Sequence, residues 1–196
     1  MEKTESVYYQ SLYEVAAAIN SARAPDKVLN SIVENVTKAM NAKGCSLMLL
    51  TPDKKHLLHT TAHGLSDRYI KKGPVSADKS IAEALEGKPV AILDATEDER
   101  AQYREQAKKE GIASILSVPM MLRDEIIGVI RVYMAEPYHF TMDDMFFVGA
   151  VANLGAIALE NSRLYDAVQK DYDAFRQDIM DWIGANWNRR STDQKV

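Results

Sequence analysis

Near the end of the chain, apolar residues return at alternating steps of four and three, from Phe147 to Trp182. This is a repeat of about 3.5 residues that lasts for about five heptads, the spacing of a helix that pairs with another helix. A helix that only covers its own domain follows a period of about 3.6 residues and needs it no further than the domain extends. The pattern therefore predicts a long helix that begins in a folded domain, continues past it and pairs with a second helix.

The start of the chain carries a similar stripe, which predicts an amphipathic helix over about residues 6–23. Two such helices favour a parallel homodimer that is joined along both. Asn161 is the polar break in the C-terminal stripe, and a buried asparagine pair costs stability but selects one register. Up to about Leu159 the stripe is also expected to form core of the domain itself. The predicted interface residues are Leu12, Val15, Ile19, Leu154, Asn161, Tyr165, Val168, Tyr172 and Phe175.

Charge and cysteine content argue against several classes of protein. The 196 residues carry a formal net charge of -4, whereas proteins that bind nucleic acid usually present a basic face. The single cysteine, Cys45, allows neither an internal disulfide nor a multi-cysteine metal site, and it suits a reducing cytoplasm. We find neither a signal peptide nor an apolar run as long as a membrane span. We therefore expect a cytoplasmic protein that binds neither nucleic acid nor membrane.

Prolines, glycines and capping motifs divide the middle of the chain into short elements. A helix is expected from Pro25 to Gly44, followed by strands over 45–50, 56–63, 89–93, 114–122 and 125–134. A hydroxyl three residues before an acid predicts helix starts at Ser80, Thr96 and Thr141. Strands joined by tight turns favour an antiparallel sheet. The predicted fold is α+β, with the terminal helices on one face of the sheet and the other face left for another purpose.

In this order and spacing the elements resemble a GAF domain, the small-molecule sensing module of phosphodiesterases, phytochromes, histidine kinases and transcriptional regulators. The resemblance covers roughly residues 8–170. It implies a GAF-like, or PAS-like, antiparallel sheet of about five to six strands, with a ligand pocket on the face away from the terminal helices. The fragments that carry it are Gly44–Leu50, Gly87–Val90, Ser117–Met120, Glu125–Ile130, Phe140–Asp144 and Leu159–Tyr165.

The resemblance also implies which residues contact a ligand. Matched to the nucleotide-binding members, these positions lie in the first strand, at the end of the second, at the start of a short helix and in the last strand. They are Ser46, Ala62, His63, Ile81, Ala82 and Arg131. Together, the guanidinium of Arg131, the ring of His63 and free backbone amides near Ile81 predict a pocket for a small anionic or carboxylate-bearing ligand.

The position of Arg131 follows from the strand itself. Alternation along 126–134 places Arg131 on the same face as Val129 and Tyr133, and a guanidinium in the middle of such a strand needs a partner. One interpretation is a bound ligand. The other is an ion pair with an acid of this chain, for which the resemblance offers Asp94, Asp98 and Glu99.

This sequence lacks residues that several known activities of GAF domains require. Of the signature of cyclic-nucleotide-binding members, only Phe140, Asp143 and Asp144 have counterparts. Bilin-carrying members attach their chromophore through a cysteine in a later helix or loop, whereas Cys45 opens the first strand. Free methionine sulfoxide reductases, which are also GAF proteins, use a nucleophilic thiol and resolving thiols, and one cysteine cannot serve as both.

Histidines and charged runs give no further site. On a regular strand His59 and His63 share a face with their rings about 13 Å apart, which is too far to bind one ion together. No metal is therefore expected, and the cofactor is left open. Lys71 and Lys72 are expected to face solvent, as are Glu97–Glu99.

The predicted function is a non-catalytic sensory or regulatory domain that binds a small ligand and signals through a dimeric helical interface. Residues 1–23 are expected to form a dimerisation helix, residues 24–170 the GAF domain, and residues 171–196 a helical extension with a polar tail. The signal would pass to a separate partner, or the chain is a domain of a longer protein. The alternatives are a dimeric scaffold or adaptor with a vestigial pocket, and a free methionine-R-sulfoxide reductase.

Overall fold

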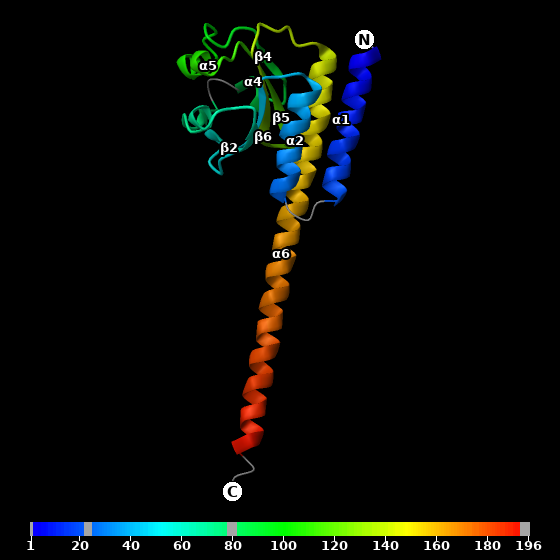
Figure 1. Cartoon of the computed structure of the whole chain (residues 1–196). Coiled ribbons are helices and arrows are strands. Elements are labelled where there is room, and N and C mark those ends of the chain that lie inside the picture. Colours follow the sequence, from blue (N-terminus) through cyan, green and yellow to red (C-terminus); the bar gives the residue numbers. More distant parts are fainter. Residues whose placement is uncertain (1, 22–24, 78–81, 193–196) are drawn as a thin grey trace. The chain divides into compact units, whose positions relative to one another are not determined.

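The computed structural model describes residues 2–21, 25–77 and 82–192 (Figure 1). The chain divides into two compact units, residues 1–158 and residues 159–196. The first unit contains the whole sheet and all helices except the later part of the last one. That helix, α6, runs from Met142 to Thr192 and belongs to both units.

The first unit is built on a six-stranded sheet in the order β3-β2-β1-β6-β5-β4, in which every neighbouring pair is antiparallel. The predicted α+β fold is thereby confirmed. The predicted strands over 114–122 and 125–134 match β5 and β6 to the residue, because Arg123 and Asp124 take the left-handed backbone conformation that a two-residue hairpin turn requires. The strands are β1 Gly44–Leu50, β2 His56–His63, β3 Val75–Ser76, β4 Val90–Ile92, β5 Ser114–Leu122 and β6 Glu125–Met134.

Helices α1, α2 and the first part of α6 lie side by side on one face of this sheet (Figure 1). Tyr8 of α1 stacks on Phe147 of α6, with the ring centroids 4.2 Å apart. Gly155 lets α6 approach closely, because a Cβ atom there would lie 3.3 Å from the Met120 side chain of β5. The helices are α1 Glu2–Ser21, α2 Pro25–Ala39, α3 Asp67–Ile70, α4 Ala82–Leu85, α5 Arg104–Glu110 and α6.

The start of α6 confirms the capping motif at Thr141. The hydroxyl of Thr141 accepts a hydrogen bond from the backbone N–H of Asp144, and the carboxylate of Asp144 accepts one from the backbone N–H of Thr141. This reciprocal pair satisfies amides that a helix start leaves free. Asp144 is buried, and its carboxylate also accepts from the hydroxyls of Tyr8, at 2.6 Å, and Tyr138, at 3.2 Å.

The helix start predicted at Thr96 is wrong. Asp94 accepts hydrogen bonds from both the backbone N–H and the hydroxyl of Thr96, so the hydroxyl is used in a turn and not in a helix cap. The helix of this region, α5, begins only at Arg104, and it ends where expected, at Gly111 in the left-handed conformation. The predicted start at Ser80 lies outside the described residues.

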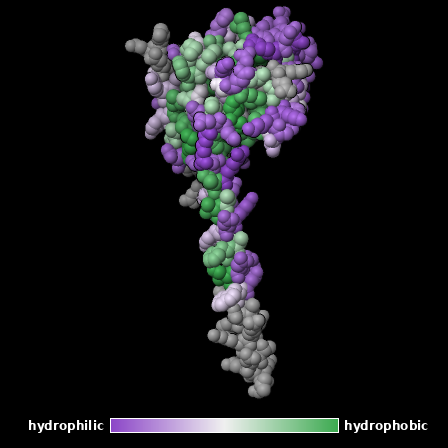
Figure 2. All heavy atoms as spheres, turned by 180° about the vertical axis from the view of Figure 1, so that it is seen from behind, coloured by the Kyte–Doolittle hydropathy of each residue, from purple (hydrophilic) through white to green (hydrophobic). Residues whose placement is uncertain are grey.

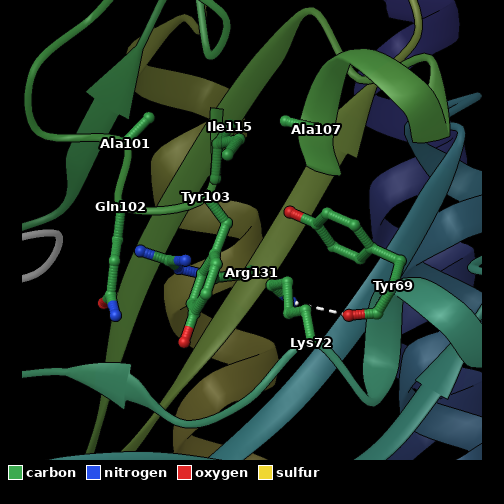
Figure 3. A pocket seen from close by; sticks show the side chains of 8 residues that line it. All are labelled: Tyr69, Lys72, Ala101, Gln102, Tyr103, Ala107, Ile115 and Arg131. Carbon is green, nitrogen blue, oxygen red and sulfur yellow. Dashed lines mark hydrogen bonds between the residues drawn. The ribbon is translucent and has the colours of Figure 1, made fainter. Parts of the chain in front are cut away.

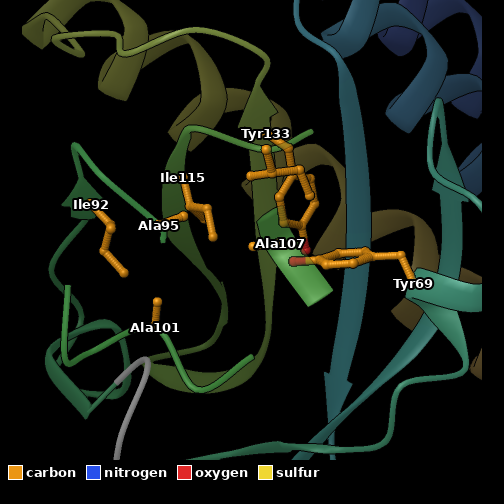
Figure 4. Close-up of a cluster of buried hydrophobic side chains, with 8 residues drawn as sticks. Tyr69, Ile92, Ala95, Ala101, Ala107, Ile115 and Tyr133 are labelled. Carbon is orange, nitrogen blue, oxygen red and sulfur yellow. The ribbon is translucent and has the colours of Figure 1, made fainter. Parts of the chain in front are cut away.

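Two apolar clusters cover the sheet face opposite α1, α2 and α6. The larger cluster joins β4, β5 and β6 to α3 and α5, and it is drawn in Figure 4. The rings of Tyr69 and Tyr133 meet edge to face within it, 5.7 Å apart. The second cluster joins β1, β2 and β6 to β3, β4 and α4 through Met48, Leu57 and Val129, among others. This face is therefore packed except where polar side chains enter it.

The part of α6 in the second unit exposes its apolar stripe. Tyr165, Val168, Tyr172, Phe175 and Trp182 are each 60–69% exposed in the described protomer. Figure 2 shows hydrophobic and hydrophilic side chains side by side along this exposed stretch. In the first unit, by contrast, Phe147, Val151 and Ala158 of the same repeat are buried, and so is Leu159 at the start of the second unit, as expected for the region up to about Leu159.

Helix α6 also contains a stretch that is long and apolar enough to cross a membrane by length and composition alone. This corrects the expectation that no apolar run reaches such a length. However, 44% of that stretch is buried within the protein, and the core helix of a soluble protein passes the same criterion.

Candidate ligand pocket

Three of the residues predicted to contact a ligand lie in one row across the sheet. Ala62 of β2 pairs with Ser46 of β1, and Ser46 pairs with Arg131 of β6. The row continues to Ser117 of β5, which pairs with Arg131 on its other side. Residues that pair directly across antiparallel strands point to the same face of a sheet, so all four belong to the face away from α1, α2 and α6.

Arg131 is the centre of this row and is only 3% exposed. Its Nε atom donates a hydrogen bond to the hydroxyl of Ser117 at 3.0 Å. The hydroxyls of Ser46 and Tyr133 lie 3.0 Å apart in the adjacent positions. The face predicted for Arg131 from strand alternation is therefore correct, and several polar groups surround it.

The acids that were considered as partners of Arg131 have contacts of their own. Asp94 accepts hydrogen bonds from Thr96, and Asp98 forms an ion pair with Arg100 at 2.7 Å. These contacts lower the pKa of Asp98, chiefly through the hydrogen bond from Arg100. Both carboxylates thus have partners close to them in the sequence.

Lys72 is the principal residue of this site that sequence reasoning missed. Its Nζ atom donates to the backbone carbonyl of Tyr69 and lies 3.0 Å from Nε2 of His59. The ammonium also lies 3.7 Å from the centroid of the Tyr69 ring, within reach of a cation–π interaction. Lys71 faces solvent as expected, but the expectation for Lys72 is wrong. Lys71 caps the four-residue helix α3 at the surface, and Lys72 follows it with its side chain in the lining of a cavity on this sheet face.

Burial sets the protonation of both basic side chains. It lowers the pKa of Lys72 to about 7, with a further contribution from the positive charge of Arg131, while Glu110 acts in the opposite direction. Burial likewise lowers the pKa of His59 to about 3, aided by the charges of Lys72 and Arg131. His59 is therefore neutral near pH 7. Its Nδ1 atom is buried and has no hydrogen-bond partner in the part of the chain that the structure describes.

Lys72 and Arg131 both line a small cavity, and Figure 3 shows the side chains around it. Its volume is about 10 Å³, which is about the least that can hold one water molecule. Gln102 and Tyr103 cover the cavity and are tied to the β3 region, because Gln102 accepts from the backbone N–H of Ser76 and Tyr103 donates to the carbonyl of Pro74. The lining residues are Tyr69, Lys72, Ala101, Gln102, Tyr103, Ala107, Ile115 and Arg131.

A bulge in β2 changes the predicted place of His63. Met48 pairs with His59 and Leu47 pairs with Thr61, so one extra residue separates the two parts of β2. His63 therefore pairs with Cys45 and points to the helix-covered face, towards α2. There the pKa of Glu34 is lowered chiefly by the hydrogen bond and charge of Lys38, with a smaller contribution from His63. The expectation that His59 and His63 share a face is wrong for this reason, and His59 takes the place beside Arg131.

The remaining predicted contacts are only partly described. Ala82 is the first residue of α4 and is exposed, while Ile81 lies outside the described residues. Among the described residues, no group of three or more histidines, cysteines or acids is arranged to hold a metal ion.

The predicted interface residues have two kinds of environment. Val15 is completely buried within the protomer, and Leu12, Ile19 and Leu154 are partly buried. Asn161 and the four predicted positions beyond it, Tyr165, Val168, Tyr172 and Phe175, are exposed. The interface itself stays a prediction.

Comparisons with known proteins agree with this architecture. The family model described as GAF domain matches residues 22–160. The GAF domain of a phosphoenolpyruvate-protein phosphotransferase from Coxiella burnetii is similar in fold, with a TM-score of 0.72, 20% identity, and coverage of 82% of this chain and 96% of that one. A free methionine-R-sulfoxide reductase from Neisseria meningitidis has a TM-score of 0.68 at 15% identity, with coverage of 81% and 91%.

A curated relative carries a function in its name. The methyl sulfide methyltransferase-associated sensor of Methanosarcina acetivorans is 25% identical over 169 residues, which are 83% of this chain. The match spans only 17% of that longer protein. Together with the family match, this relative indicates a sensory or regulatory role. On the strength of the family model, which covers well over half of its length, this chain belongs to the GAF domain family.

Proposed function

We propose that this chain is a non-catalytic sensory GAF domain that binds a small anion on the sheet face around Arg131 and signals through paired helices. The observation that carries the proposal is the convergence of Arg131, Lys72 and His59 on one face, next to the hydroxyls of Ser46 and Tyr133. These groups offer donors and positive charge in a partly dry environment. That combination suits a carboxylate or an inorganic anion.

Electrostatics give the physical reason. Lys72 and Arg131 are both basic and line the same cavity, and burial first, then the proximity of Arg131, disfavours the protonated form of Lys72. An anion between them would turn this repulsion into two attractions that are strengthened by the low local dielectric. Binding should therefore raise the pKa of Lys72 and take up protons near neutral pH.

Calorimetry against a panel of small carboxylates, inorganic anions and nucleotides tests this proposal. We expect at least one small anion to bind, and Arg131→Gln to weaken that binding at least about tenfold, since it removes a charge-assisted contact worth about 1.5–3 kcal/mol. Arg104→Gln is the matched control, because Arg104 is exposed on α5 and its guanidinium donates a hydrogen bond to the backbone carbonyl of Glu97, at 3.3 Å. A panel without binding, or equal affinities for wild type and Arg131→Gln, would refute the proposal.

The paired helices are supported by the stripe on α6. In the described protomer, large apolar side chains that recur at steps of three and four stand in solvent from Tyr165 to Trp182. Exposed apolar surface of this periodicity is the signature of a coiled-coil seam. A second copy of the chain supplies the matching stripe, so a ligand-dependent change in the first unit would be read out where two copies of α6 pair.

We propose a non-catalytic domain because Cys45, the single cysteine, is not placed to act as a nucleophile in the pocket. Its thiol is completely buried in β1, and burial raises its pKa. Cys45 also pairs with Val132, so it lies on the face opposite Arg131. A thiol that is protonated, buried and turned away from the pocket cannot act there as a nucleophile. The fold shared with a methionine sulfoxide reductase does not bring that enzyme's chemistry with it.

A second candidate function is a dimeric scaffold or adaptor whose pocket is vestigial. The observation that favours it is the small cavity, about 10 Å³, which the chain's own side chains nearly fill. A scaffold of this kind would dimerise as expected but show no change in melting temperature with any small ligand. Thermal shift measurements with the same anion panel therefore separate the two functions.

A further inference from the structure

We propose that the amine of Lys72 is a carbamylation site, at which CO2 adds to the side chain and leaves a carbamate that faces Arg131. This inference rests on the proposed function, because it names CO2 as the molecule that supplies the anion of the same pocket. It assigns the site a reversible covalent ligand in place of a freely diffusing one.

The geometry holds this amine in place. Hydrogen-bond contacts of 3.0 Å to the carbonyl of Tyr69 and to Nε2 of His59 fix the Nζ atom at the wall of the cavity. Its neighbour Lys71 differs in every respect, since its side chain is 77% exposed and pairs with Asp67 on the surface. The two adjacent lysines therefore provide one enclosed amine and one ordinary amine in the same chain.

Size favours a ligand of very few atoms. The cavity of about 10 Å³ takes about one water molecule, and its cover of Gln102 and Tyr103 is tied down by hydrogen bonds. CO2 has three atoms in a line and adds only one carbon and two oxygens to Nζ. Nucleotides and larger carboxylates would require the cover to be displaced.

The reaction needs an unprotonated amine and no co-reactant besides CO2. The nitrogen lone pair attacks the carbon, a C–N bond forms, one C=O electron pair moves to oxygen, and the nitrogen releases one proton to water. The groups that face Lys72 are His59, Tyr69, Tyr103, Glu110 and Arg131. Burial and the charge of Arg131 lower the pKa of Lys72 to about 7, so a large share of this amine is neutral at neutral pH, unlike a solvent-exposed lysine.

The product changes the electrostatics of the pocket. Before the reaction a protonated Lys72 repels the guanidinium of Arg131, and afterwards a negatively charged carbamate attracts it. The guanidinium can also donate two parallel hydrogen bonds to a planar carbamate, as it does to carboxylates. The charge of this side chain thus changes sign, and the force between it and Arg131 changes from repulsion to attraction, which can alter how the surrounding side chains pack.

Trapping of the carbamate in the intact protein tests the proposal. The wild type is equilibrated with carbon-13-labelled bicarbonate and CO2 at pH 7.5, treated with triethyloxonium to convert carbamates into stable ethyl esters, digested and examined by mass spectrometry. We expect the labelled adduct at Lys72, with at least about tenfold higher occupancy than at any exposed lysine. Lys71→Arg should leave the adduct unchanged, Lys72→Arg should abolish it, and Arg131→Gln should reduce it several-fold.

The carbon-13 NMR signal of the untreated wild type provides a second readout that needs no variant. At constant dissolved CO2, its intensity should rise from pH 6 to pH 8 as Lys72 loses its proton. A wild type without this signal, or with adducts spread evenly over exposed lysines, overturns the inference. If the wild type then binds an inorganic anion and Arg131→Gln weakens that binding, the proposed anion-binding function survives while the carbamate does not; if nothing binds, both fall.

Discussion

Among single residues, Lys72 is the one whose protonation most directly links the pocket to folding. Its amine lies against Tyr69 and His59, and the pKa of the folded state is lowered to about 7 from 10.5. Between these two values the unfolded chain holds a proton that the folded chain lacks. By linkage, the lowered pKa of Lys72 decreases the free energy of unfolding. The decrease is complete at and below pH 7 and disappears as the pH rises towards 10.5.

Replacing Lys72 by Met should therefore alter how stability depends on pH. We expect the free energy of unfolding of the wild type to rise relative to that of Lys72→Met by roughly 0.5–1 kcal/mol per pH unit above pH 7, after allowance for partial solvent screening. Urea unfolding at pH 7, 8 and 9 measures this difference. Lys71→Met serves as control and should show a flat difference, while parallel curves for wild type and Lys72→Met would contradict the lowered pKa.

The residues of the pocket were predictable from the sequence only where the chain is regular. Arg131 lies in the uninterrupted strand β6, so simple alternation gives its face. His63 follows a bulge in β2, and a single extra residue moves every later side chain to the opposite face. Lys72 comes after a short helix in a charged segment, and nothing in the local pattern distinguishes it from Lys71. Its burial depends on Tyr69 and Tyr103, which the fold brings together.

At the scale of elements, the beginning of α6 anchors the helical layer. The buried carboxylate of Asp144 accepts hydrogen bonds from Tyr8 of α1, from Tyr138 and from the backbone of Thr141. One side chain thus joins α1, the segment before α6 and the helix cap. The pKa of Tyr8 is raised chiefly by burial. Its hydrogen bond to Asp144 raises this pKa further, because a neighbouring carboxylate opposes ionisation of the hydroxyl.

Substitution of Asp144 by Asn tests the strength of this junction. We expect a loss of about 2–3 kcal/mol in the free energy of unfolding, because the amide cannot accept on both atoms and leaves buried donors without a charged partner. Asp143→Asn is the matched control, since Asp143 is exposed in the same helical turn, and it should cost less than about 0.5 kcal/mol. If chemical denaturation gives the same loss in the free energy of unfolding for Asp144→Asn and Asp143→Asn, only the charge at the helix start matters, which would contradict the proposed junction.

Elements were predictable where their local signals agreed with one another. The turn at Arg123 and Asp124 and the cap at Thr141 each act within a few residues, and both appear as expected. At Thr96 two local signals competed, and the turn formed with Asp94 prevailed over the helix cap. The short elements α3 and β3 were not predicted, because they depend on contacts with α5 and β2.

At the scale of the whole molecule, association through α6 is the central expectation. Phe175 is 63% exposed in the protomer and occupies a core position of the predicted heptads. Phe175→Asp would place a charge in the seam, and we expect the dissociation constant of the dimer to increase at least about 30-fold, equivalent to 2 kcal/mol or more. Sedimentation equilibrium measures it.

The neighbouring position provides the control for this experiment. Ala174 is also exposed but lies outside the stripe, so Ala174→Asp adds the same charge without entering the seam and should leave the dissociation constant unchanged. A wild type that sediments as a monomer at micromolar concentration would disprove the proposed association. Equal weakening by both variants would instead indicate general charge repulsion.

The lone thiol has a practical consequence. Because Cys45 is fully enclosed in the central strand β1, an alkylating reagent can reach it only when that strand is laid open. The rate of its modification therefore reports how often the native sheet comes apart, without any introduced label. The effects of ligands, carbon dioxide and the variants above on the opening of the sheet can all be compared through this one rate of modification.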